Sequence, residues 1–181
     1  MGRRLLLAWL LLGLASATRA QEPVHLVVET GAERLEVWRG ERLIATFEEI
    51  AIGRFGPTPD KHRGDGATPL GRYHVVGVNG GSDFHRFIAL DYPSPADARR
   101  GLAEGLITPA QFAAIETAHR QGRLPPQRTP LGGHIGIHGV GEGDLQIHRL
   151  FNWTQGCVAL EDDQLDALLT WVRPGLSVEI R

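Results

Sequence analysis

Alternating hydrophobic and polar residues run through much of the chain and predict short β-strands. In the segment Arg34–Arg39, the apolar Leu35 and Val37 alternate with the charged Arg34 and Glu36, which is the two-residue period of a half-buried strand. Comparable patterns or short apolar runs predict the other strands: Val24–Glu29, Leu43–Ile52, Gly71–Asn79, His85–Leu90, Ile135–His138, Gln155–Leu160 and Leu176–Ile180. We expect the first two strands of the chain to form a hairpin.

Two capping patterns interrupt the strands and predict a pair of helices. Ser94 is followed by a proline and then by Asp97, and Thr108 is followed by a proline and then by Gln111. A hydroxyl residue with an acidic or amide side chain three positions later is typical of a helix N-terminus, as is proline at the first helical position. The two predicted helices cover Pro95–Glu104 and Pro109–Gln121, and together form a helical insertion at residues 95–121.

A further helix is predicted near the C-terminus. Four apolar residues recur there at the spacing of one helical face: Leu165, Leu168, Leu169 and Val172. The acidic run 161–163 lies in the first turn, where the helix dipole favours negative charge, and Pro174-Gly175 ends the helix. The expected fold is therefore mainly β, a mixed β-sheet or sandwich, with a short helical insertion and a C-terminal helix.

The N-terminus carries the features of a secretory signal peptide. Arg3 and Arg4 precede the apolar run Leu5–Leu14, and small residues then offer cleavage after Ala17 or Ala20. The apolar run is shorter than the roughly 20 residues that a membrane span requires. We therefore expect residues 1–20 to be removed on export to the periplasm, and residues 21–181 to form one domain with no membrane span.

The charge of the mature chain disfavours nucleic acid as a partner. The full sequence has 19 basic and 21 acidic residues, and residues 1–20 contain three arginines and no acid. Removing them changes the formal charge from −2 to 16 − 21 = −5. Phosphate binding needs a clustered positive field. One local basic cluster does occur, at residues 54–63, and the sequence leaves open whether it is a solvated loop or a rim that meets acidic groups of a substrate.

A single cysteine is the most informative residue for chemistry. Exported domains use cysteines in disulfide pairs, so one unpaired thiol is a candidate reactive group or a small buried residue. His138 precedes Cys157 by 19 positions, at the end of a predicted strand. A histidine base can activate a thiol, whose ordinary pKa of about 8.5 leaves it mostly protonated at neutral pH. The pattern favours a thiol nucleophile, with two neighbouring strands bringing both residues together.

Glycines flank both of these residues. Gly139 follows the histidine and Gly156 precedes the cysteine, which leaves the backbone open to a close approach. The N–H groups of Gly156 and Cys157 are candidate donors to an oxyanion. His134, two alternations before His138, is expected to face the same side of the strand.

The motif around these residues resembles the L,D-transpeptidase catalytic domain family (YkuD type). The resemblance rests on Ile137-His138-Gly139, on Thr154-Gln155-Gly156-Cys157-Val158, and on the upstream Thr68-Pro69-Leu70-Gly71-Arg72-Tyr73. It covers roughly residues 24–181. It implies a peptidoglycan-acting enzyme without a cofactor, in which Cys157 is the nucleophile, His138 is the base and the Gly139 carbonyl orients the ring. Stem peptides of peptidoglycan would be the partners.

The resemblance also suggests which residues contact the substrate, and the sequence departs from the family pattern at two positions. Candidate substrate-binding residues are Gly156, Gln155, Thr154, His134 and, in the loop before the motif, Arg149. The family commonly has histidine at the position of Gln155 and arginine or asparagine at that of Ala159. An arginine there could pair with a substrate carboxylate, so the resemblance does not indicate how this chain holds the donor or the acceptor.

Two alternative functions stay open from the sequence. The Asn152-Trp153-Thr154 lead-in resembles a branch of the family for which hydrolysis is an alternative, so an L,D-carboxypeptidase or amidase acting on the same site is the second hypothesis. A third is a zinc-dependent hydrolase, in which His134 and His138 bind the metal with further ligands from Asp144, His148 or Cys157. The spacing matches no strong zinc motif, and we predict no metal site.

Overall fold

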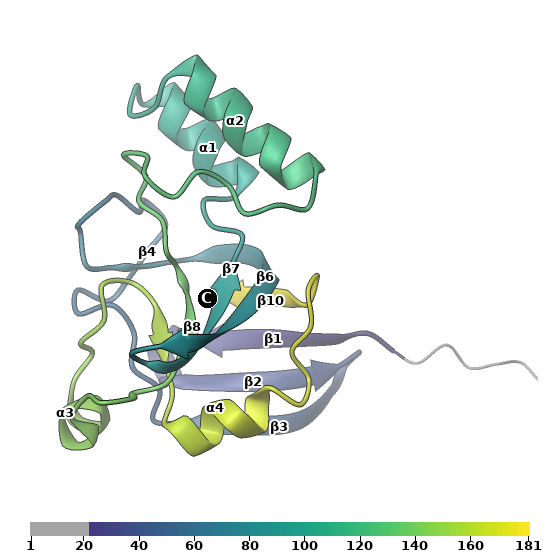
Figure 1. Ribbon diagram of the computed structural model, residues 1–181, viewed down its shortest axis with the longest axis vertical. Helices are drawn as coiled ribbons and strands as arrows, with labels where there is room; N and C mark the ends of the chain where they lie inside the picture. The colour runs from purple at the N-terminus through teal and green to yellow at the C-terminus, as the bar shows by residue number, and fades with distance from the viewer. Residues whose placement is uncertain (1–21) are drawn as a thin grey trace, which may run out of the picture.

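The protein is built on one mixed sheet of eight strands (Figure 1). The computed structural model describes residues 22–181, so the predicted signal peptide lies outside the described residues. The strands, in sheet order, are β3 (Arg42–Glu48), β2 (Arg34–Arg39), β1 (Val24–Glu29), β10 (Ser177–Ile180), β6 (Gly71–Ser82), β7 (His85–Leu90), β8 (Gly136–His138) and β9 (Val158–Ala159). A second, two-stranded sheet joins β4 (Pro57–Thr58) to β5 (Thr68–Pro69).

Strand pairing confirms the predicted mainly β fold. β1 and β2 form the expected antiparallel hairpin, with Val28 opposite Leu35, and both side chains are fully buried. The C-terminal β10 pairs parallel with β1 and antiparallel with β6, so it joins the two halves of the sheet. β8 and β9 lie at one edge, where they pair parallel with each other.

The main core lies where the C-terminal helix covers the sheet. α4 (Asp162–Leu168) directs Leu165 and Leu168 into the same cluster as Leu26 and Val37 of the hairpin. All four side chains are fully buried. Burying a leucine side chain stabilises the fold by about 1.5–3 kcal/mol. The predicted apolar face of this helix is thus confirmed, although the α-helical part ends at Leu168.

The helical insertion forms a separate layer at one end of the molecule (Figure 1). Its helices are α1 (Pro95–Ala103) and α2 (Pro109–Arg120). Both predicted capping boxes are present, with the Ser94 hydroxyl accepting from the Asp97 N–H at 3.2 Å. Ile115 and Leu131 belong to a small hydrophobic cluster distinct from the main core. Among residues 22–181, no helix has the length and apolarity to cross a membrane.

Three local predictions were wrong. The predicted strand Gln155–Leu160 is shortened to β9 (Val158–Ala159), because the Thr154 hydroxyl bonds to the Gly156 N–H and the Cys157 carbonyl and holds the preceding residues in a turn. β3 ends at Glu48 rather than at residue 52, because Glu49 has a left-handed φ of 59° that interrupts the strand. The segment before the cysteine motif is helical, α3 (Leu145–Leu150), rather than a loop. The Asp144 carboxylate accepts the Gln146 N–H at 2.7 Å and caps this helix, so Arg149 lies on α3.

Candidate active site

Pairing of β8 with β9 brings the histidine and the cysteine to one face of the sheet. Ile137 lies opposite Val158 and His138 lies opposite Ala159. Ile137 and Val158 are fully buried in the core. Because side chains alternate along a strand, His138 and Cys157 both point to the other face. They are diagonal neighbours there, as the sequence predicts.

A hydrogen bond to the next residue fixes the ring of His138. Its Nδ1 lies 2.7 Å from the carbonyl oxygen of Gly139. Since a carbonyl can only accept, Nδ1 carries the proton and the neutral ring presents the lone pair of Nε2. Burial lowers the pKa of His138, the bond to Gly139 opposes that change, and the charge of His148 lowers the pKa further. The ring is therefore a neutral base at pH 7.

Aromatic rings enclose the imidazole. The ring of Phe84 lies 4.7 Å from that of His138, centroid to centroid, and the rings of Trp153 and Phe87 lie at 5.7 Å and 6.2 Å. The indole N–H of Trp153 donates to His148 Nδ1 at 3.3 Å, which holds the indole in place. These contacts orient the base by packing, and a single backbone carbonyl completes its support.

The thiol is protonated in the resting structure. Cys157 is half-buried, and its Sγ donates a hydrogen bond to the carbonyl oxygen of His134 at 3.2 Å. Burial raises the pKa of the thiol to about 11, against the opposing effects of a backbone hydrogen bond from Gly136 and the positive charge of Lys61. These pKa shifts favour the neutral forms of both the cysteine and the histidine at pH 7.

Thr154 holds the turn that presents the cysteine. Its buried hydroxyl accepts the Gly156 N–H at 3.1 Å and donates to the Cys157 carbonyl at 2.7 Å. The Gly156 N–H, predicted as an oxyanion donor, is therefore already bonded within the turn. Among residues 22–181, the Cys157 N–H has no acceptor and stays available. Thr154 supports the turn from inside, rather than facing a substrate.

Glycine is the only residue type that fits at position 156. A Cβ there would lie 2.5 Å from the Ala67 carbonyl oxygen and 3.2 Å from Lys61 Nζ, and the backbone has a φ of +130°. Glycine therefore lets the loop of Lys61 pack directly against the turn of the cysteine.

Lys61 is a component of the site that the sequence did not single out. It belongs to the basic cluster at 54–63, yet its side chain is only 3% exposed, so the solvated-loop interpretation is wrong for this residue. The ammonium group pairs with Asp65 and also donates to the Gln155 carbonyl at 3.5 Å. The signal that could have found it is its isolation, because Lys61 is the only lysine in the sequence.

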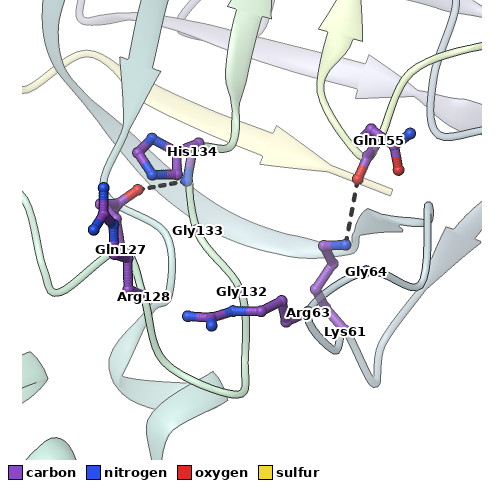
Figure 2. A pocket seen from close by; sticks show the side chains of 9 residues that line it. All are labelled: Lys61, Arg63, Gly64, Gln127, Arg128, Gly132, Gly133, His134 and Gln155. Carbon is purple, nitrogen blue, oxygen red and sulfur yellow. Dashed lines mark hydrogen bonds between the residues drawn. The ribbon is translucent and has the colours of Figure 1, made fainter.

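A cavity of about 330 Å³ lies next to the turn of the cysteine motif, and Figure 2 shows the residues that line it. Gln155 and His134, both predicted substrate contacts, line it. The backbone of His134 is fixed there by its N–H, which donates to Gln127 Oε1 at 2.6 Å. Gln127 lies on the return from the helical insertion, so the segment that follows the insertion supplies one wall of the cavity.

Arg149 lies elsewhere. Its guanidinium pairs with Glu161 at 2.6 Å and lines a different hollow, beside Glu33 and Glu49. The substrate role predicted for Arg149 therefore gains no support from its position. Ala159, where an arginine is common in the resembling family, is fully buried and presents no side chain to a ligand.

The zinc hypothesis finds no ligand set. Within residues 22–181, no group of three or more histidine, cysteine, aspartate or glutamate side chains is arranged to hold a metal ion. His138 instead uses Nδ1 on a carbonyl, and His148 accepts from an indole.

Comparison with known sequences decides the family. The family model described as "L,D-transpeptidase catalytic domain" (YkuD) matches residues 23–180. The chain belongs to the L,D-transpeptidase catalytic domain family. The resemblance seen in the motif is confirmed, as is the prediction of an enzyme of this family. Among curated proteins, no sequence matches the chain.

Solved structures share the L,D-transpeptidase fold at low sequence identity. Pgp2 (K307A mutant) from Campylobacter jejuni, a helical cell shape determining protein, is 21% identical with a TM-score of 0.62, over 90% of this chain and 48% of its own. Bd1075 from Bdellovibrio bacteriovorus is 16% identical with a TM-score of 0.58, over 91% and 50%. An L,D-transpeptidase from Mycobacterium smegmatis is 11% identical with a TM-score of 0.51, over 87% and 58%. The chain thus spans about half the length of these structures.

Proposed function

We propose that this L,D-transpeptidase-family chain is an exported enzyme that acts on peptidoglycan stem peptides through a Cys157 acyl-enzyme. The observation that carries the proposal is the placement of Cys157 diagonally beside His138, whose Nδ1 is fixed on the Gly139 carbonyl at 2.7 Å. That arrangement leaves Nε2 free as a base on the face where the thiol lies. Export rests on the signal-peptide pattern of residues 1–20.

Acylation begins with a neutral pair. Sγ of Cys157 leaves the His134 carbonyl and attacks the carbonyl carbon of the third stem residue, while its proton passes to Nε2 of His138. The Cys157 N–H donates to the oxygen that becomes negative. The peptide C–N bond then breaks, and the departing D-amino acid takes the proton from His138. A thioester on Cys157 is left.

Deacylation sets the reaction class. An acceptor amine attacks the thioester, gives its proton to His138 and forms a new amide, while the C–S bond breaks and the thiol regains a proton. Water follows the same path and releases a free acid. We assign transpeptidation as the main reaction. L,D-carboxypeptidase or amidase activity is the second candidate, because the same acyl-enzyme would react with water.

The test is a mass spectrum of the mature protein after incubation with tetrapeptide muropeptides. We expect a thioester on Cys157, and its loss in Cys157→Ala. Cross-linked dimers indicate transpeptidation, and tripeptides or freed stems alone indicate hydrolysis. His138→Ala should slow acylation by about 10²–10⁴-fold, the usual contribution of a general base. An unmodified thiol with no change in the muropeptides would refute the proposal.

A further inference from the structure

The cavity next to the cysteine motif is lined by basic side chains, although the chain without residues 1–20 has a negative net charge. Lys61, Arg63, Arg128 and His134 all line it, and among the described residues that line it none is acidic. The ammonium of Lys61 is already neutralised by Asp65. Arg63 and Arg128 therefore supply the positive charge of the cavity that is not already paired within the protein.

Neither arginine has an ionic partner. Both Arg63 and Arg128 are exposed, and no carboxylate among residues 22–181 lies within 4.0 Å of either guanidinium. By contrast Arg100, on the neighbouring α1, pairs with Glu104 at 2.9 Å. Each of these two guanidinium groups, which line the same cavity, can bind a carboxylate through two parallel hydrogen bonds.

The backbone that carries these arginines is fixed. The Arg63 N–H donates to the Pro130 carbonyl at 2.8 Å, which ties the loop of Lys61 to the return from the insertion. On that return, the Gln127 amide donates to the Tyr92 carbonyl at 2.8 Å, next to Arg128. In Figure 2 the Arg63 side chain extends toward the segment that carries Arg128. The scaffold is thus organised before a ligand arrives, and only the side-chain ends must be ordered.

Two lining residues bring the cavity close to Cys157. The His134 carbonyl that accepts the thiol hydrogen bond belongs to a lining residue, and Gln155 lies two positions before the cysteine. A substrate whose scissile carbonyl lies at Sγ can therefore place its next residue in this cavity. A volume of about 330 Å³ suits a small group, at the low end of the roughly 300–1,000 Å³ of ligand pockets.

We propose that Arg63 and Arg128 form a carboxylate-binding subsite that holds a free carboxylate of the stem peptide. This inference rests on the proposed function, and specifies it, because a site that binds a free carboxylate selects stem peptides in which that carboxylate is unmodified. Two sources carry that chemistry: the C-terminal carboxylate of the terminal D-amino acid and the side-chain carboxylate of the diamino acid.

The experiment compares three tetrapeptide substrates: the free acid, one amidated at the C-terminus and one amidated at the diamino acid. We expect Arg63→Gln and Arg128→Gln each to lower kcat/KM for the free acid by about tenfold, the value of one charge-assisted hydrogen bond. For the peptide lacking the bound carboxylate, the variants and the unaltered enzyme should be equally slow. The amidation that abolishes the difference identifies the source. Arg63→Lys should restore part of the loss, because it keeps charge without the fork.

A matched control and a binding measurement separate this subsite from the proposed function. Arg123→Gln removes an exposed arginine outside this cavity and should leave kcat/KM unchanged. Calorimetric binding of the same peptides to Cys157→Ala tests the subsite without turnover. If the enzyme turns over no peptide but Arg63→Gln still weakens binding of the free acid alone, the subsite stands and the proposed function falls. Equal losses for free and amidated peptides, or no loss in either variant, would overturn the subsite.

Discussion

The thiol of Cys157 donates its hydrogen bond to the carbonyl oxygen of His134, 3.2 Å away, rather than to the imidazole of His138. The nucleophile is therefore held in a protonated state on the side of the substrate cavity. In the proposed mechanism a substrate meets a thiol, and the proton transfer to His138 accompanies attack. This arrangement differs from a preformed thiolate–imidazolium pair, in which the proton has moved before the substrate arrives.

Thiol reactivity should follow this protonation state. Because burial raises the pKa of Cys157 to about 11, we expect alkylation by iodoacetamide to accelerate steadily from pH 7 to 10 with no plateau near neutrality. Ultraviolet absorbance of the thiolate measures the same titration. A plateau below pH 8 in the intact enzyme, absent from Cys157→Ala, would show a preformed thiolate.

The activity of the enzyme should fall in mildly acidic solution and not at neutral pH. His138 must be neutral to accept the proton, and burial lowers its pKa below the ordinary value. Activity should therefore fall as the pH drops through a value below about 6.5, and stay constant above it up to the titration of the thiol. The pH profile of kcat/KM measures this. An acidic limb centred above pH 7 would contradict the neutral-pair mechanism.

Replacing Lys61 should damage both stability and the thiol. Lys61→Met leaves Asp65 without its buried partner, and breaking such a pair costs about 3–5 kcal/mol. It also removes a positive charge that lowers the pKa of Cys157, so alkylation at pH 8 should slow. Urea unfolding gives the first quantity and alkylation the second. The double variant Lys61→Met, Asp65→Asn should recover part of the stability, and no recovery would show that the two residues act independently.

Thr154 should matter through its hydroxyl alone. Thr154→Val keeps the shape but leaves the Gly156 N–H and the Cys157 carbonyl without their partner, at a cost of about 1–3 kcal/mol. The turn then loosens, and we expect kcat to fall more than KM rises. Thr154→Ser preserves the bonds and serves as the control. Equal stability and activity in the valine variant would show that the hydroxyl has no such role.

Gly156 should not tolerate a methyl group. Gly156→Ala places a Cβ 2.5 Å from the Ala67 carbonyl oxygen at a φ of +130°, so we expect a loss of at least about 2 kcal/mol in unfolding free energy. Gly31→Ala is the matched control, because a Cβ there meets nothing within 4 Å. Similar thermal melting temperatures for the two variants would contradict the packing argument.

Local patterns of the sequence predicted several elements of the fold, and the resemblance to a known family supported the fold as a whole and the pairing of His138 with Cys157. Alternation predicted the β1–β2 hairpin, and the capping boxes at Ser94 and Thr108 predicted both helices of the insertion. His138 and Cys157 could be placed together because each lies at or beside a short strand of the same motif. In these regions the structure follows from interactions between residues close in sequence.

The missed features depend on contacts between distant segments. The Lys61 ammonium reaches the Gln155 carbonyl across 94 positions of sequence, and no local pattern shows that this loop is buried. The Gly156 N–H was mistaken for a free donor because the sequence could not show that Thr154 would fold back on it. The helix α3 was missed because it is only six residues long and leaves Leu150 71% exposed, without the buried face that usually marks a helix.

The separate hydrophobic cluster of the insertion means that two regions of this protein are held together by different groups of buried side chains. Ile115 and Leu131 pack with their own neighbours, apart from the core that supports Cys157 and His138. Substitutions in α1 and α2 can therefore reshape the wall that carries Arg128 without disturbing the strands of the reacting pair. Substitutions within this small cluster should therefore alter the cavity wall more than they alter the pairing of β8 with β9.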